Sequence, residues 1–175
     1  MKNFFKYAAG IFFAFLFRLI PIPNVEPIMS TMMPYAKRWG VFAGVLFTFL
    51  AMITFDLITG TIGFWSFLTI GTYCLIAVFA GFFFKNRGKV KHYVIFAVIG
   101  TLFYDAVTGL GVGMLVFNQT FVQTLTMQIP FTLIHLASNT LLALLVSPAL
   151  YKWVLKNPRW EASKVIAYFK KVVGA

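Results

Sequence analysis

The sequence predicts an all-α membrane protein, a six-transmembrane-helix bundle with its N- and C-termini in the cytoplasm. Of its 175 residues, 61% are hydrophobic and only 11% are charged, whereas soluble domains carry about 25% charged residues. The apolar runs recur and are long enough for helices that cross a bilayer, which takes about 20 residues each. The basic residues collect between these runs, in segments that one topology places on a single side.

Six apolar blocks define the expected helices, and the second of them is short. The blocks span about residues 4–20, 25–36, 39–58, 64–84, 92–114 and 128–151. The first resembles a signal peptide but has no small-x-small cleavage site before Arg18, so we interpret it as a retained helix. The second would reach only about 18 Å into a core of about 30 Å, and it contains Pro34. We therefore expect a short second helix buried among its neighbours.

Charge sets the expected topology of this multi-pass protein of the plasma membrane. Of the 15 Lys and Arg residues, 14 occur at the N-terminus, at Lys37 and Arg38, from Lys85 to Lys91, or from Lys152 onward. Six crossings place all these segments in the cytoplasm, where positively charged loops are favoured. The net charge of +11 therefore follows from topology. We expect a lipid bilayer as partner and no nucleic acid. Arg18 is the exception to this pattern.

The chain after residue 155 is expected to lie on the cytoplasmic membrane surface. Asn157 and Pro158 are good helix-start residues. Apolar residues then recur at helical spacing, and Lys164, Lys170 and Lys171 fall off that stripe, as in a basic amphipathic helix at an interface. We expect two units: a transmembrane domain over residues 1–155 and an interfacial helix over residues 156–175.

The outer side is expected to hold most acidic residues. Asp56 and Asp105 lie near the outer ends of the third and fifth blocks, in the related stretches FDLITG and YDAVTG. Glycine after threonine suits a helix C-cap, so a repeated stop signal is one interpretation. Acids near a helix C-terminus also favour a cationic partner, and Arg18 is the outward cation. We expect Arg18 to form a salt-bridged cluster with Asp56 or Asp105, either structural or as the floor of a ligand pocket.

The sixth block carries its own polar group in PFTLIHLASN. His135 and Asn139 are four residues apart and share a helix face. Hydrogen bonding between helices by a buried neutral histidine is one interpretation, and ligand binding is the other. We expect no metal site, because no carboxylate, cysteine or second histidine is spaced to complete one.

Catalytic motifs are absent, and we do not expect an enzyme. The stretch YDAVTGLGVGM resembles the Tyr-Asp and Gly-x-Gly-Asp motifs of intramembrane aspartyl proteases, but Val112 stands where the second aspartate is needed. Nucleophile-elbow, zinc-protease and phosphate-cradling motifs are also missing. We expect no cofactor.

The order of features along the chain resembles a known family. A short N-terminus and a first helix with small residues precede the loop RLIPIPNVEP, a stubby second helix and PFTLIHLASN. This order resembles the substrate-binding S components of prokaryotic energy-coupling factor (ECF) vitamin transporters over nearly the whole chain. The resemblance implies a vitamin-like substrate bound near the outer side, beneath the loops between helices 1–2, 3–4 and 5–6. It also implies docking of the first helix on a transmembrane coupling subunit driven by two ATPases.

The resemblance assigns roles to individual residues. Gly10 and Ala14 form a small-x-x-x-small pair that would contact the coupling subunit. Prolines restrict the loop PIPNVEP, which would hold Asn24 and Glu26 over the cavity as a lid; alternatively, Asn24 caps the second helix and Glu26 lies in its first turn. The expected substrate-binding residues are Arg18, Asn24, Glu26, Asp56, Trp65, Asp105, His135 and Asn139. The alternative function is a small polytopic membrane scaffold that recruits partners without transport.

Cysteine labelling in intact cells with an impermeant reagent tests the topology. Cys74, the single cysteine, is first replaced by alanine. In that background Gln119→Cys should be modified and Arg87→Cys should be spared, because charge asymmetry places them outside and inside. Labelling after cell lysis controls for accessibility, and the reverse pattern would contradict the six-helix topology.

Overall fold

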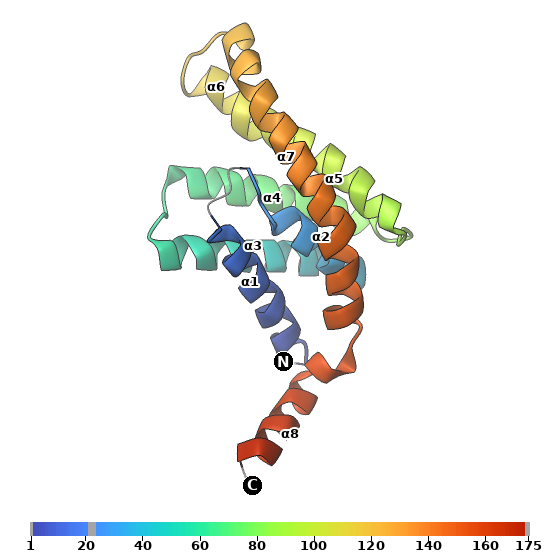
Figure 1. Ribbon diagram of the computed structural model, residues 1–175. Coiled ribbons are helices and arrows are strands. Elements are labelled where there is room, and N and C mark those ends of the chain that lie inside the picture. Colours follow the sequence, from blue (N-terminus) through green and yellow to red (C-terminus); the bar gives the residue numbers. More distant parts are fainter. Residues whose placement is uncertain (1, 21–23, 174–175) are drawn as a thin grey trace.

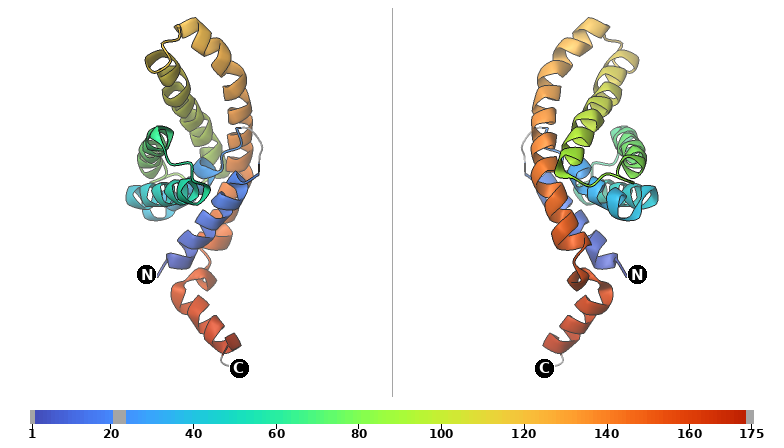
Figure 2. Two further views of the ribbon diagram at one scale, coloured as in Figure 1. Left: turned by 90° about the vertical axis from the view of Figure 1, so that its left-hand side faces the viewer. Right: turned by 90° about the vertical axis from the view of Figure 1, so that its right-hand side faces the viewer.

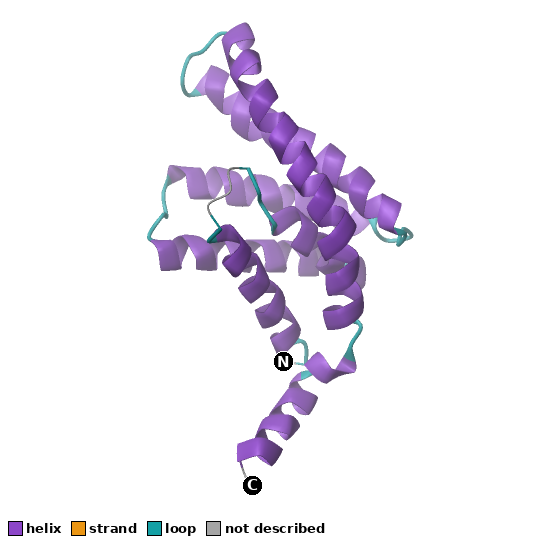
Figure 3. Ribbon diagram, viewed as in Figure 1, coloured by secondary structure: helices purple, strands orange, loops and turns teal. Residues whose placement is uncertain are grey.

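A computed structural model describes residues 2–20 and 24–173, and every regular element in these ranges is helical (Figures 1 and 3). The α-helices are α1 (Phe4–Arg18), α2 (Ile28–Trp39), α3 (Val41–Thr59), α4 (Phe64–Phe83), α5 (Val90–Asp105), α6 (Val112–Leu115), α7 (Phe121–Leu150) and α8 (Ala162–Val173). Two π-helical segments, η1 (Ala106–Gly111) and η2 (Tyr151–Leu155), continue α5 and α7, and a 3₁₀ turn, η3, spans Pro158–Trp160. The all-helical prediction is confirmed.

Four helical stretches of the described chain are long and apolar enough to cross a membrane. They are Val41–Thr59, Phe64–Phe83, Val90–Leu115 and Phe121–Leu155. Large apolar side chains such as Phe42, Phe67 and Leu133 are exposed on them, as expected of surfaces that contact lipid. The chain is therefore a helical membrane protein. Helices α1 and α2 have only 15 and 12 residues, so four of the six expected crossings have the length of a span.

Helix α2 lies at the centre of the molecule. Helices α3 and α4 form one hairpin, α5 and α7 form another, and α2 packs on all of them (Figures 1 and 2). Every residue from Ile28 to Ala36 is buried. The prediction of a short second helix buried among its neighbours is confirmed, although the helix begins at Ile28, after Pro27, and not at residue 25.

Pro34 does not break α2, because α7 supplies the hydrogen bond that the proline removes. A proline has no N–H, so the carbonyl four residues earlier loses its donor within the helix. In α2 that carbonyl belongs to Ser30, and the hydroxyl of Ser147 on α7 donates to it at 2.6 Å. Buried backbone groups of a membrane protein have to be satisfied in this way, since lipid offers no hydrogen bonds.

Helix α7 begins at Phe121, seven residues before the predicted block at 128. Its first turn is fixed by a capping box. The Thr120 hydroxyl accepts from the Gln123 backbone N–H at 3.3 Å, and the Gln123 side chain accepts from the Thr120 backbone N–H at 3.0 Å. Residues 121–127, which were expected to precede the helix, therefore form its start. The apolar block began later because Gln123, Thr124 and Thr126 interrupt the apolar run.

The tail after residue 155 is helical, but its α-helix starts later than expected. Asn157 accepts a hydrogen bond from the Arg159 backbone N–H and begins η3, and α8 follows from Ala162. No residue of α8 is buried. Two contacts fix its start to the N-terminus: Ala162 N–H donates to the Lys2 carbonyl at 3.1 Å, and Glu161 lies 3.5 Å from the Lys2 amine.

The basic segments gather at one end of the molecule. The Lys6 amine donates to the Leu155 carbonyl at 3.0 Å, and the Lys37 amine donates to the Gly88 carbonyl at 2.9 Å. These bonds join the N-terminus to the end of α7, and the end of α2 to the α4–α5 connection. We call this region the basic end. The four basic segments thus lie together, as their expected position on one side of the membrane requires.

Gly10 and Ala14, expected to contact a partner subunit, pack inside the chain instead. Ala14 is 1% exposed. A Cβ atom at Gly10 would lie within 3.0 Å of the Phe47 ring and clash with the Tyr35 hydroxyl, which donates to the Lys6 carbonyl. The small residues therefore let α1 approach α2 and α3. The predicted docking role of this pair is not supported, because its face is already occupied.

This packing predicts that Gly10→Leu destabilises the protein by about 2 kcal/mol, the cost of overfilling a packed core. Ala8→Leu is the matched control, because Ala8 is exposed on the same helix. Thermal unfolding in detergent measures both variants. A Gly10→Leu protein that unfolds at the same temperature as Ala8→Leu would contradict the packing of α1 described here.

Candidate functional site

A cavity of about 300 Å³ lies where the end of α1 and the α1–α2 connection meet α3, α4, α5 and α7. Its walls combine aromatic rings with charged and polar side chains. The lining residues are Arg18, Ile20, Asn24, Val25, Glu26, Phe55, Tyr73, Tyr104, Phe131 and His135. Four of the expected binding residues therefore meet here: Arg18, Asn24, Glu26 and His135.

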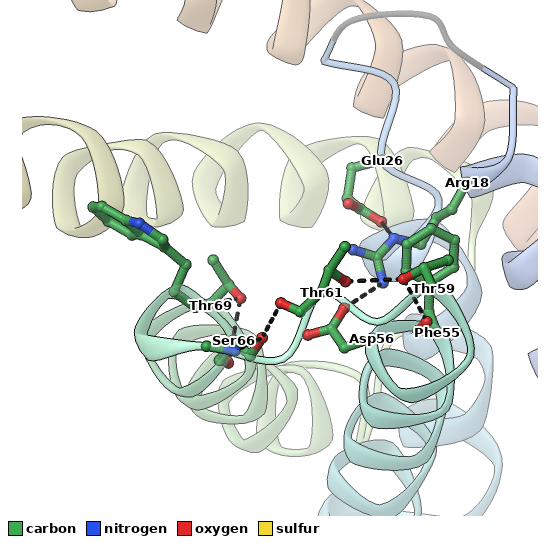
Figure 4. Close-up of polar contacts among 10 residues, drawn as sticks. Arg18, Glu26, Phe55, Asp56, Thr59, Thr61, Ser66 and Thr69 are labelled. Carbon is green, nitrogen blue, oxygen red and sulfur yellow. Dashed lines mark hydrogen bonds and ion pairs between the residues drawn. The ribbon is translucent and has the colours of Figure 1, made fainter.

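Arg18 connects three elements at this cavity. It is the last residue of α1, and its Nε atom lies 3.3 Å from Oε1 of Glu26. An Nη atom lies 3.9 Å from Oδ1 of Asp56 on α3. The guanidinium carbon is 4.0 Å from the centre of the Phe55 ring, within the range of a cation–π interaction. Figure 4 shows the guanidinium between the two carboxyl groups and over this ring.

The expected cluster of Arg18 with Asp56 is thus present, and Glu26 joins it. The side chains of Arg18, Glu26 and Asp56 are 16%, 24% and 8% exposed, so the ion pairs are partly shielded from solvent. Burial raises the pKa of the Glu26 carboxyl, and the Arg18 guanidinium opposes this shift. One cation therefore faces two carboxyl groups, and it favours the charged form of Glu26.

Asp105 pairs with His135 and not with Arg18. Its Oδ1 atom lies 2.8 Å from Nδ1 of His135 on α7, and both side chains are 3% exposed. Asp105 lies at the end of α5, as predicted, but the helical path continues beyond it through η1 and α6 to Leu115. This continuation carries Asp105 into the interior, opposite α7.

The two related stretches FDLITG and YDAVTG have different structures. Gly60 has φ 68° and ends α3 as a left-handed C-cap, as the stop-signal interpretation predicts. Gly109 lies within η1, where a Cβ atom would clash with the amide of Gln128 on α7. The second glycine therefore permits close approach of α7, and the stop-signal interpretation holds only for the first.

Helix α7 also fixes the connection between α1 and α2. Ser138 donates a hydrogen bond to the Asn24 carbonyl at 2.6 Å, and Asn24 has φ 61°. Asn139 donates to Thr101 on α5 at 2.9 Å. The alternative role of Asn24 as the cap of α2 is wrong, because Pro27 occupies that position. Pro21 and Pro23 of the expected lid lie outside the described residues.

Several buried polar atoms at the site have no hydrogen-bond partner among the described residues. Four belong to residues that line the cavity. The Tyr73 hydroxyl and Nε2 of His135 have no partner at all, whereas an Nη atom of Arg18 and Oε1 of Glu26 take part only in the ion pairs described above. Leaving a buried polar group unsatisfied costs about 1–3 kcal/mol. Polar atoms of this kind around one cavity therefore call for a polar ligand or ordered water inside it.

Aromatic rings form much of the cavity wall. The rings of Tyr73 and Tyr104 lie 4.4 Å apart between centres, and Tyr104 and Phe131 each meet the His135 ring at 5.7 Å. Phe55, Tyr73 and Phe131 were missed, because phenylalanine is abundant throughout the chain and Tyr73 lies in an uninterrupted apolar run.

Four expected binding residues do not line the cavity. Asp56 acts through Arg18, and Asn139 bonds to Thr101. Trp65, which is 46% exposed at the start of α4, stacks on Phe117 with ring centres 6.0 Å apart. Asp105 touches the cavity only through His135. Within the described ranges, no group of three His, Cys, Asp or Glu side chains could hold a metal ion.

No protein-family model matches the chain, and neither a curated protein nor a solved structure matches it. The function therefore has to be argued from the cavity and its residues.

The cluster predicts that Arg18→Ala lowers the stability by about 2 kcal/mol, because it leaves two partly buried carboxyl groups without their cation. The double variant Arg18→Ala/Glu26→Gln should recover part of this loss, since one of the stranded charges is gone. Thermal unfolding in detergent compares the two. Equal unfolding temperatures would show that Arg18 and Glu26 do not interact.

Proposed function

We propose that the protein is the substrate-binding membrane subunit of an ECF-type importer and that the cavity beside Arg18 binds a vitamin or a related micronutrient. The observation that carries the proposal is the pair of buried polar atoms without any partner among the described residues, the Tyr73 hydroxyl and Nε2 of His135, which line one cavity together with the ion-paired Arg18 and Glu26. Packing alone gives no reason to bury these groups together.

The size and walls of the cavity support a small, flat ligand. Its volume of about 300 Å³ lies at the lower end of the range for small-molecule sites, about 300–1,000 Å³. Phe55, Tyr73, Tyr104 and Phe131 offer aromatic surfaces on which a planar ring can stack. Arg18, Glu26 and His135 provide donors and acceptors at its edges.

The proposed arrangement in the membrane follows the charge pattern. The chain would cross the plasma membrane six times, with both termini and the basic end in the cytoplasm. The cavity lies at the far end of α1 from Lys6, which in this topology is the outer side. Since the sequence contains no nucleotide-binding motif, the energy for transport would come from a transmembrane coupling subunit and its two ATPases.

Tyr73→Phe tests the site, because it removes only the unpartnered hydroxyl and keeps the ring. The protein purified in mild detergent should carry a small molecule, which mass spectrometry identifies. We expect Tyr73→Phe to bind this molecule about tenfold more weakly, which corresponds to one hydrogen bond of about 1.4 kcal/mol. Titration calorimetry with the identified compound measures the change.

Tyr93→Phe is the matched control. Tyr93 is also a buried tyrosine with an unpartnered hydroxyl, but it lies at the basic end and does not line this cavity. Its replacement should leave the affinity unchanged. Purified protein that carries no small molecule but retains partner proteins would contradict the proposal and favour a membrane scaffold. Co-purification with an ATPase pair would support the importer.

A further inference from the structure

A second cavity, of about 550 Å³, lies at the basic end. It is bounded by the end of α2, the α4–α5 connection, the start of α5 and the end of α7 with η2. Its lining residues are Lys37, Gly88, Val90, Tyr93, Pro148, Tyr151, Lys152 and Lys156. None of these residues takes part in the site described above.

The charges at this cavity are uncompensated. The amines of Lys37 and Lys156 lie 4.0 and 5.2 Å from the centre of the same ring, that of Tyr151. Lys152 adds a further positive charge to the lining. Three cations that line one cavity repel each other, so they favour an anion between them.

The acids of the chain are engaged elsewhere. Glu26 and Asp56 lie beside Arg18, and Asp105 pairs with His135. Glu161 lies 3.5 Å from the Lys2 amine. Because the sequence contains only four acidic residues, no acidic side chain is left to supply a counter-charge to this cavity, so an anion from outside would fit it.

Tyr93 provides an independent indication of a ligand. This residue is 1% exposed and lines the cavity, yet its hydroxyl has no hydrogen-bond partner among the described residues. A phenol donates readily to a phosphate oxygen. Val90, which also lines the cavity, is 41% exposed, so the cavity has an apolar side chain at its border, as expected where helix ends meet lipid.

We infer that this cavity binds the phosphate group of an anionic phospholipid. Lys37, Lys152 and Lys156 would surround the phosphate, and the Tyr93 hydroxyl would donate to one of its oxygens. The acyl chains would pass out over Val90 along the lipid-facing surface. Basic pockets between transmembrane helices bind anionic headgroups through this chemistry. The inference does not depend on the proposed transport function.

The test measures the unfolding temperature of the full chain in a neutral detergent with added phosphatidylglycerol, phosphatidylcholine or inorganic phosphate. Phosphatidylglycerol should raise the unfolding temperature, and the other two should not. Lys152→Gln/Lys156→Gln should lose most of this shift. Without lipid, that variant should unfold no lower than the wild type, because it removes charges that repel Lys37.

Two comparisons make the test specific. Lys85→Gln/Lys91→Gln removes two cations from the same end that do not line the cavity, and it should keep the shift. Tyr93→Phe should reduce the shift while every charge is retained. Equal losses in the two lysine double variants would overturn the site in favour of diffuse surface charge. A shift of the same size with inorganic phosphate would overturn the lipid assignment in favour of a soluble anion, and no shift with phosphatidylglycerol would overturn the inference as a whole.

Discussion

Twelve residues are too few to cross a bilayer alone, so α2 is held in place by the helices that surround it. Its burial sets the position of its neighbours, since α3, α4, α5 and α7 all pack on it. It also sets the geometry of the cavity. Because α2 begins immediately after Pro27, Glu26 lies just before the helix and lines the cavity. There it forms an ion pair with Arg18 at the end of α1. Small residues on α1 allow this helix to pack closely on α2, where Gly10 contacts Tyr35.

The two cavities of this largely apolar chain are lined by side chains of different charge. One holds a cation between two carboxyl groups with a histidine and aromatic rings nearby, so it can meet a ligand with mixed polarity. The other holds only cations and tyrosines among its ionisable side chains, so it selects for negative charge. In both, a buried tyrosine hydroxyl without a partner makes the unoccupied state less favourable than a well-packed apolar interior.

The sequence was sufficient for features that depend on composition and local chemistry. Apolar blocks located the main helices, and the shortage of outward cations predicted that Arg18 pairs with Asp56 or Asp105. The structure shows the first of these two pairs. The sequence was insufficient for contacts that depend on the register between two helices. Asp105 meets His135 because η1 and α6 extend the α5 path beside α7, and no pattern within either segment encodes that alignment. The start of α7 was missed because Thr120 and Gln123 form a capping box ahead of the continuous apolar run, and polar residues separate the two.

The hydrogen bonds of α7 have a consequence for the order in which the protein is assembled. Ser138 and Ser147 donate to the carbonyls of Asn24 and Ser30, and Lys6 donates to Leu155 in η2. Each bond joins the last long helix to the first thirty or so residues synthesised. Until α7 has been synthesised, the Ser30 carbonyl therefore lacks the hydroxyl donor that replaces the N–H missing at Pro34. A chain truncated before Ser147 therefore lacks a hydrogen bond that stabilises α2 in its buried position.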